Sequence, residues 1–194
     1  MPDLTFVPPN AVEAEEAVLG SLLIDADSVE DVAALLKPGD FYREHNGWIF
    51  AAALALRNRR EPVDYLTLLA ELEHRGQLSE VGGASYLVGL INATPTAVHA
   101  LAYARQVKEA AVRRRIIAFA GEAARLAYNQ SLPLEDALAA VEAGAFALRE
   151  DLRGADALRP LAEVVAAVTA NLAALVAGQA RPLLTTGFNG LDRL

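Results

Sequence analysis

The segment from Thr96 to Asn129 constrains the fold of this chain more than any other stretch. It holds no proline and one internal glycine. Its apolar residues recur at spacings of three and four, which is the repeat of one helix face. These residues are Leu101, Ala104, Val112, Ile116, Phe119, Ala123 and Leu126. The pattern predicts a single helix, about 50 Å long at a rise of about 1.5 Å per residue.

A second helix is predicted to fold back on the first. The sequence NQSLP, residues 129–133, forms the turn, and a near-heptad apolar stripe follows it. The stripe comprises Leu134, Ala137, Val141, Ala145, Leu148 and Leu152. We assign residues 96–152 to an antiparallel αα-hairpin. A two-helix hairpin cannot bury all its apolar positions by itself. Packing within the hairpin and self-association therefore both remain open for Leu134, Val141, Ala145 and Leu148.

Residues 1–95 are expected to form a small helical globular head. Capping patterns predict helix starts at Asn10, with Glu13 three residues on, and at Ser28, with Asp31 three residues on. Further helices are predicted near residues 44–59, after Asp64, and in VGGASYLVGLIN. Gly76 should close the helix that Asp64 caps, because a left-handed residue at a helix end favours glycine.

Two residue clusters in the head admit simple structural explanations. The aromatic-rich stretch DFYREHNGWIF predicts a core in which Trp48 is buried beside Phe41, Ile49 and Phe50. The carboxylates Glu13, Glu15 and Glu16 lie in the first turns of a predicted helix, where the helix dipole favours negative charge. Neither cluster requires a catalytic role.

Composition favours an all-α protein and argues against several functions. Hydrophobic residues make up 54% of the chain but aromatic residues only 6%, so alanine, leucine and valine dominate. The net charge of −8 disfavours a nucleic-acid surface. The absence of cysteine excludes disulfides and thiolate metal sites. The start MPDLTFVPPN lacks the basic and apolar regions of a signal peptide, and no apolar run approaches the roughly 20 residues that span a bilayer. A cytoplasmic protein without membrane contact is expected.

A charged stretch at residues 149–160 predicts a flexible connector, and Pro160 then opens a last helix that runs to Ala177. Between Leu161 and Ala177 only Glu163 is ionisable. The apolar stripe of this helix is Leu161, Val165, Val168, Leu172 and Leu175. So much exposed apolar area is an association hazard, so the helix should dock on a partner. We assign residues 153–184 to a linker.

The sequence offers no catalytic constellation. His45, His74 and His99 lie far apart with no partner at metal-ligand spacing, and no GxxxxGK[ST] phosphate loop occurs. We therefore expect no cofactor, metal or enzymatic activity in this stretch. The run from Arg113 to Arg115 follows Glu109 on the long helix, which favours a solvated helix face or an acidic protein partner over DNA.

Several blocks together resemble the bacterial replicative DNA helicases of the DnaB family. They are PPNAVEAEEAVLGSLLID, DFYREHNGWIF, EPVDYLTLLAELE, VGGASYLVGLINATPTAVHALAYARQVKEAAVRRRII and TTGFNGLDRL. Blocks in a fixed order at fixed spacing are far more specific than any one alone. The resemblance implies that residues 185–194 begin a RecA-like motor whose phosphate loop, with ATP and Mg, would follow. The full-length protein would then be an ATP-dependent helicase.

The resemblance also implies partners. N-terminal domains of such helicases pair through the hairpin into a collar on a hexameric ring around single-stranded DNA, and their linker helix docks on the neighbouring motor. The collar binds primase, for which Tyr86 and Ile117 match the blocks GGASYL and RRRII. The residues alone are equally compatible with core positions for both. A helicase loader is a further candidate partner. The alternative is a standalone helical adaptor that never had a motor.

Overall fold

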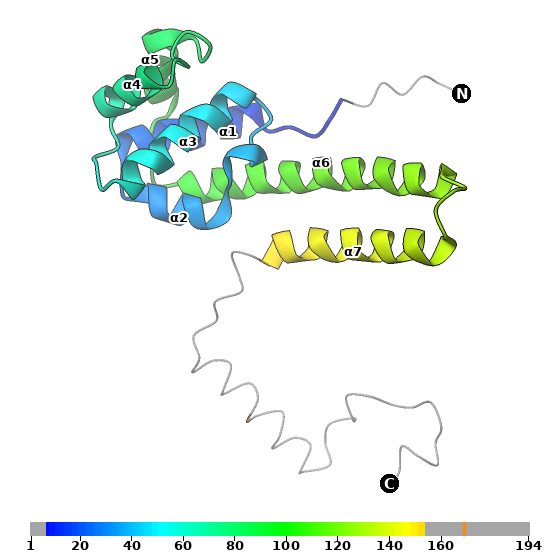
Figure 1. Ribbon diagram of the computed structural model, residues 1–194. Helices are drawn as coiled ribbons and strands as arrows, with labels where there is room; N and C mark the ends of the chain where they lie inside the picture. The colour runs from blue at the N-terminus through cyan, green and yellow to red at the C-terminus, as the bar shows by residue number, and fades with distance from the viewer. Residues whose placement is uncertain (1–6, 154–168, 170–194) are drawn as a thin grey trace. The chain divides into compact units, whose positions relative to one another are not determined.

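The computed structural model describes residues 7–153 and residue 169, and every regular element within residues 7–153 is helical (Figure 1). The helices are α1 (Val12–Ile24), α2 (Ser28–Leu35), the 3-10 turn η1 (Pro38–Asp40), α3 (Glu44–Asn58), α4 (Tyr65–His74), α5 (Gly83–Ala93), α6 (Ala100–Tyr128) and α7 (Leu134–Arg153). The predicted all-α fold is confirmed. All five residues of the predicted linker stripe, and residues 185–194, lie outside the described residues.

The head is built around α1, which packs against α3, α5 and α6. Val18, Leu19 and Leu22 of α1 are each at most 1% exposed. Gly20 faces α5 at a close crossing, where a β-carbon would collide with the side chain of Thr94 and the carbonyl oxygen of Leu90. The absence of a side chain at Gly20 is therefore what lets α1 and α5 approach each other.

The caps of the head helices follow the sequence patterns only in part. The Asp64 carboxylate accepts hydrogen bonds from the amides of Leu66 and Thr67, both at 2.9 Å, as predicted. The predicted cap at Asn10 is wrong: Ala11 precedes α1, and the Asn10 amide donates to the Pro8 carbonyl at 3.0 Å. Because α1 begins at Val12, the N-cap position falls on Ala11 and not on Asn10.

The predicted cap at Ser28 is also wrong. Ser28 is the first residue of α2, and Asp27 stands before the helix without a side-chain capping bond. The Ser28 hydroxyl donates to the Asp25 carbonyl at 2.6 Å, across the turn that joins α1 to α2. Because α2 already begins at Ser28, this residue lies one position past the N-cap, and its hydroxyl closes the turn between the two helices.

Two helices of the head end in the same backbone motif with different residues. At the end of α4, Gly76 has a φ of 67° and Gln77 N–H donates to the Leu72 carbonyl at 2.9 Å. The glycine predicted there is confirmed. At the end of α3, Arg60 holds the equivalent place with a φ of 60°, and the following amide donates to the Leu56 carbonyl at 3.0 Å. A residue with a β-carbon costs roughly 1 kcal/mol in this conformation.

The aromatic cluster of the head differs from the prediction at one residue. Ile49 and Phe50 are at most 1% exposed, and the Phe50 ring lies 5.2 Å from that of Phe41. Trp48 is only half-buried and packs on the edge of the core. Neighbouring residues on a helix point about 100° apart, so Trp48 cannot share the inward direction of both residues that follow it.

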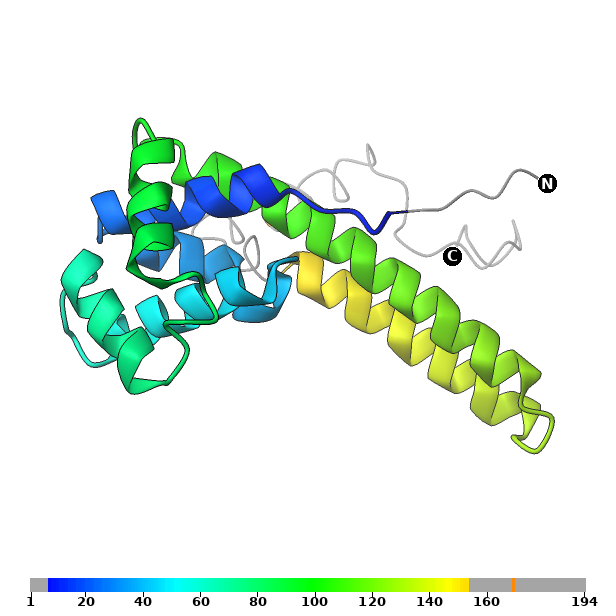
Figure 2. The same cartoon turned by 90° about the horizontal axis from the view of Figure 1, so that it is seen from above.

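Helix α6 belongs to both the head and the hairpin. Its first half packs against α1, α2 and η1, and Ala104 and Val107 there are at most 1% exposed. Its second half packs against α7, which runs back antiparallel to it after a short turn (Figure 2). One continuous helix therefore carries the hairpin out of the head core.

Candidate protein-interaction site

The base of the hairpin is fixed to the head by a buried ionic cluster. Asp40 in η1 is 1% exposed, and its carboxylate pairs with Lys108 at 3.2 Å and with Arg115. The Lys37 amide also donates to it, at 2.9 Å. Two cations from α6 thus meet one buried carboxylate of the head, which fixes where the hairpin leaves it.

The arginine run is therefore mostly structural. Arg114 donates to the Pro9 carbonyl at 2.9 Å and to the Asp40 carbonyl, and its guanidinium lies 5.6 Å from the centre of the Tyr42 ring. Arg113 alone of the three is exposed, and it pairs with Glu109 at 2.6 Å. The expectation of a solvated face applies to Arg113 and is wrong for its two neighbours, which hold α6 to the head.

A second buried carboxylate orders the surface beside this cluster. Glu15 of α1 is 1% exposed and accepts hydrogen bonds from the amides of Tyr42 and Arg43 and from the Asn46 side chain, the last at 3.0 Å. The Asn46 carbonyl oxygen in turn accepts the Tyr86 hydroxyl at 2.8 Å. Glu15 is thus a buried acceptor, a role that the helix dipole alone does not predict.

The structure gives Tyr86 and Ile117 different environments. Tyr86 on α5 is half-buried, its hydroxyl is bonded to Asn46, and its ring meets His45 edge-on at 5.3 Å. Burial, with the nearby Glu16 charge, raises the pKa of Tyr86 above its ordinary value. Ile117 is 57% exposed on α6, one turn beyond Arg114. Tyr42 contacts Glu15 through its backbone amide and Arg114 through its ring.

The hairpin is closed by a regular seam. On α7 the half-buried residues are Ala137, Val141, Gly144 and Leu148, and on α6 they include Phe119, Ala123 and Leu126. Gly144 accommodates Phe119, because a β-carbon there would lie within 2.9 Å of a Phe119 ring carbon. Val141 and Leu148 therefore contribute to packing within the hairpin. Leu134 and Ala145 are exposed.

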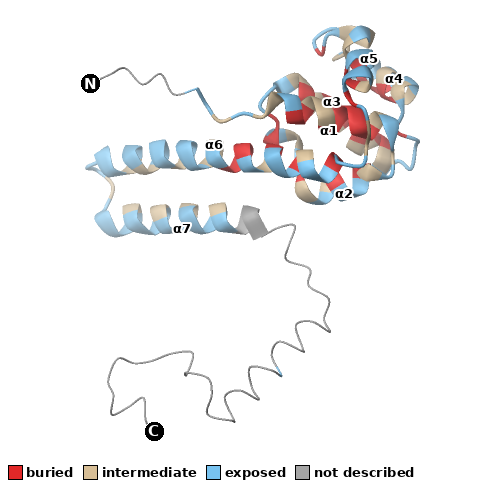
Figure 3. Cartoon of the chain, turned by 180° about the vertical axis from the view of Figure 1, so that it is seen from behind, coloured by how far each residue is buried: buried red, intermediate tan, exposed pale blue. Residues whose placement is uncertain are grey.

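One side of the hairpin is an exposed apolar face. It consists of the apolar residues that stand one residue after, or three residues before, a seam residue: Ile116, Ala120, Ala124 and Ala127 on α6, and Leu134, Leu138 and Ala145 on α7. The charged residues Glu142 and Arg149 occupy the remaining positions of this kind on α7. In an antiparallel helix pair, equivalent flanking positions lie on the same side of the seam. The exposed fractions are 75% for Leu134, 55% for Leu138 and 50% for Ile116, and Figure 3 shows how much of the hairpin surface is exposed. We call this set the hairpin face.

The sequence patterns identify this face incompletely. Leu134 and Ala145 belong to the predicted stripe, but Leu138 and Ile116 were not among the predicted self-association positions. On both α6 and α7, residues of this face lie about 100° around the helix axis from the seam residues. That regular offset could have identified Leu138 and Ile116. The large exposed residues Phe146 and Tyr128 lie about half a turn from the seam, outside the hairpin face.

The described part of the chain offers surfaces for contact and few groups for chemistry. Residues 7–153 contain no group of three potential metal ligands among His, Asp and Glu. None of the helices described there is both long enough and apolar enough to cross a membrane. The described residues thus form an all-α module in which a helical head projects an alanine-rich hairpin with an exposed apolar face.

Comparison with known proteins identifies the kind of module. The family model of the DnaB-like helicase N-terminal domain matches residues 7–109. The chain belongs to this family. It is 44% identical over 124 residues to the replicative DNA helicase DnaB of Geobacillus stearothermophilus, an alignment that covers 64% of this chain and 27% of that protein. The chain thus spans less than a third of the length of this relative.

Solved structures agree with this result. The crystal structure of the N-terminal domain of DnaB helicase from Mycobacterium tuberculosis superposes with a TM-score of 0.69 at 38% identity, over 72% of this chain and 99% of that one. The N-terminal domain of DnaB helicase from Helicobacter pylori, described with its interactions with primase, gives a TM-score of 0.53 at 26% identity, over 60% of this chain and 91% of that one.

Proposed function

We propose that this chain is the assembly and primase-docking region of a replicative DNA helicase. Family membership supports the first part, and the description of the Helicobacter pylori domain with primase supports the second. Because the relatives are much longer, we assign ATP and Mg binding, duplex unwinding and the hexameric ring around single-stranded DNA to the whole protein. The observation that carries the proposal is the exposed hairpin face.

The hairpin face has enough apolar surface to drive pairing of two copies. Full burial of a leucine or isoleucine side chain contributes roughly 1.5 to 3 kcal/mol. Leu134, Leu138 and Ile116 from each of two copies would contribute several times that amount, before the entropic cost of association. The partner in this contact is a second copy of the chain, joined through equivalent faces.

Self-association is tested by sedimentation over a concentration series. Leu138→Glu places a charge in the middle of the hairpin face and should shift the protein to the monomer. Ala143→Glu adds the same charge at an exposed position of α7 away from that face, and should associate like the parent. Equal association of both variants and the parent would show that the hairpin face is not the contact.

The two adjacent isoleucines of α6 separate the proposed contacts. Ile117 and Ile116 are both exposed and point about 100° apart. Ile117→Ser should weaken binding of the cognate primase with little effect on self-association, and Ile116→Ser should do the reverse. Calorimetric titration with primase and sedimentation measure the two effects. Unchanged primase affinity in Ile117→Ser would remove Ile117 from the proposed site.

The linker helix is proposed to tie neighbouring subunits of the full-length ring. Its stripe from Leu161 to Leu175 would dock on the neighbouring motor, and a loader would act on that same assembled protein. Replacing Leu172 and Leu175 by Asp in the full-length protein should weaken hexamer formation while the head stays folded. A doubly substituted helicase that assembles and unwinds DNA like the parent would contradict this tie.

A further inference from the structure

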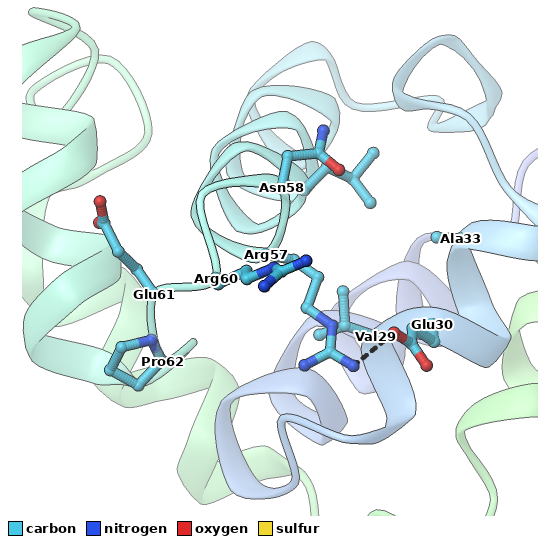
Figure 4. Close-up of a pocket in the computed structure, with 9 residues that line it drawn as sticks. Val29, Glu30, Ala33, Arg57, Asn58, Arg60, Glu61 and Pro62 are labelled. Carbon is cyan, nitrogen blue, oxygen red and sulfur yellow. Dashed lines mark ion pairs between the residues drawn. The ribbon is translucent and has the colours of Figure 1, made fainter.

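A groove on the head is separate from the surfaces described above. It lies between α2, which contributes Val29, Glu30 and Ala33, and the end of α3 with the loop that follows it (Figure 4). Leu54, Arg57, Asn58, Arg60, Glu61 and Pro62 complete the lining, around a volume of about 850 Å³. None of these residues belongs to the hairpin face or to the Tyr86 and Ile117 positions. A ligand here would leave those surfaces free.

The floor of the groove is apolar and its walls are charged. Val29 is fully buried, and Ala33 and Leu54 are half-buried at its base. Glu30 and Arg57 form an ion pair of 2.5 Å between α2 and α3, visible as the dashed line in Figure 4. The floor can therefore take an apolar side chain while the walls remain polar.

Most of the charges around the groove neutralise one another. Glu61 accepts from Arg59 at 2.9 Å, and Arg59 also pairs with the nearly buried Glu71 at 2.6 Å. Arg57 is paired with Glu30. Arg60 makes no side-chain hydrogen bond or ion pair within the described residues, so the groove carries one uncompensated positive charge on its lining.

The backbone at Arg60 makes this unpaired arginine notable. It occupies the left-handed position that glycine fills at the matching end of α4, and it does so with a φ of 60°. The helix ending itself would form more readily with glycine, as Gly76 shows. The backbone motif therefore does not account for an arginine here. Its long cationic side chain is exposed on the rim of the groove.

We propose that this groove binds an acidic and apolar segment of a protein partner. A carboxylate of the segment pairs with the Arg60 guanidinium, whose planar fork matches a carboxylate in a two-point contact. An adjacent leucine-sized side chain sits on the accessible parts of Ala33 and Leu54. A nucleic-acid ligand fits less well, because two carboxylates line the groove and one free arginine does not make a phosphate-binding cluster.

The test uses a fluorescein-labelled peptide of nine residues in which aspartate and leucine alternate. Fluorescence anisotropy should show saturable binding to the whole chain, weaker at high salt because the pairing is electrostatic. The same peptide with asparagine for aspartate should bind at least tenfold more weakly. Absence of saturable binding by the aspartate peptide overturns the proposal, as does equal binding of the two peptides.

Variants locate the contact. Arg60→Gly removes the cation and relieves the backbone, so it should unfold at the same or a higher urea concentration while losing at least tenfold in peptide affinity. Arg105→Gln removes one exposed arginine of α6, so its net charge equals that of Arg60→Gly. This variant should bind the peptide like the parent. Equal losses in both variants would indicate a nonspecific charge effect and reject the groove. Amide resonances of Val29, Ala33 and Glu61 should shift on titration, and shifts confined to the hairpin would also reject it.

Discussion

Gly144 lets the two helices of the hairpin approach, and its replacement by alanine tests that packing. A β-carbon at this position would lie 3.5 Å from Phe119 Cζ and 2.9 Å from Cδ2, and closer still to Cε2. Either the Phe119 ring leaves its place or the helices separate. Overpacking of this kind costs typically about 1 to 3 kcal/mol. Alanine in place of a mid-helix glycine returns about 1 kcal/mol of helix propensity.

The matched control is Gly121→Ala on α6. Gly121 is also a mid-helix glycine, but a β-carbon there meets nothing within 4 Å, so this variant should gain the full propensity term of about 1 kcal/mol. Gly144→Ala should be less stable than Gly121→Ala by about 1 to 3 kcal/mol, the overpacking cost alone. Adding Phe119→Leu to Gly144→Ala should recover part of the difference.

The measurement is urea unfolding followed by far-ultraviolet circular dichroism, with all variants at one protein concentration because self-association would add to apparent stability. The difference in the free energy of unfolding between the two alanine variants isolates the packing cost, since both variants share the gain in helix propensity. If Gly144→Ala and Gly121→Ala are stabilised equally, the close contact of Gly144 with Phe119 does not hold the hairpin together, and the seam must be assigned differently.

Three further outcomes are expected. Asp64→Ala should lower the free energy of unfolding by about 1 kcal/mol through loss of the α4 cap, whereas Asp27→Ala, which removes no capping bond, should change it little. Hydrogen bonds from Arg59 and then Arg75 lower the pKa of Glu71 from 4.5 to about 2, so stability present above pH 4.5 should fall as acid titration approaches pH 2. Trp48→Ala should cost less than the 3 to 5 kcal/mol typical of a fully buried tryptophan, and the native indole should be partly accessible to acrylamide.

Local signals account for the parts of the fold that were predicted correctly. Asp64 and Gly76 combine a residue type with a backbone need at a helix end, and α3 begins at Glu44 as its sequence indicates. The pattern of α6 is long enough to predict its helix, but the predicted start at Thr96 is wrong, since α6 begins at Ala100 after a turn. The all-α class follows from the composition, because alanine, leucine and valine dominate and aromatic residues are few.

The remaining features depend on contacts between distant segments. Glu15 is buried because the loop before α3 brings two amides to it, which no local pattern reveals. Arg114 and Arg115 are drawn to the head by Asp40, more than seventy residues earlier. The left-handed turn after α3 could not be predicted, because residue 60 is an arginine and not the glycine that usually marks such a turn. For the hairpin face, the stripe fixes which residues are apolar, but the partner helix decides which of them are covered.

The passage of α6 from a buried start to an exposed end sets how the molecule opens locally. Amide hydrogens around Val107 and Ala111 sit where the helix is enclosed by α1, α2 and η1, and they exchange only when the head itself opens. Those near Tyr128 are covered by α7 alone and exchange by fraying at the turn. A second copy on the hairpin face would slow exchange at the distal end while leaving the proximal end unchanged. The amide exchange rates along α6 therefore report whether a second copy is bound to its outer half, independently of the stability of the head.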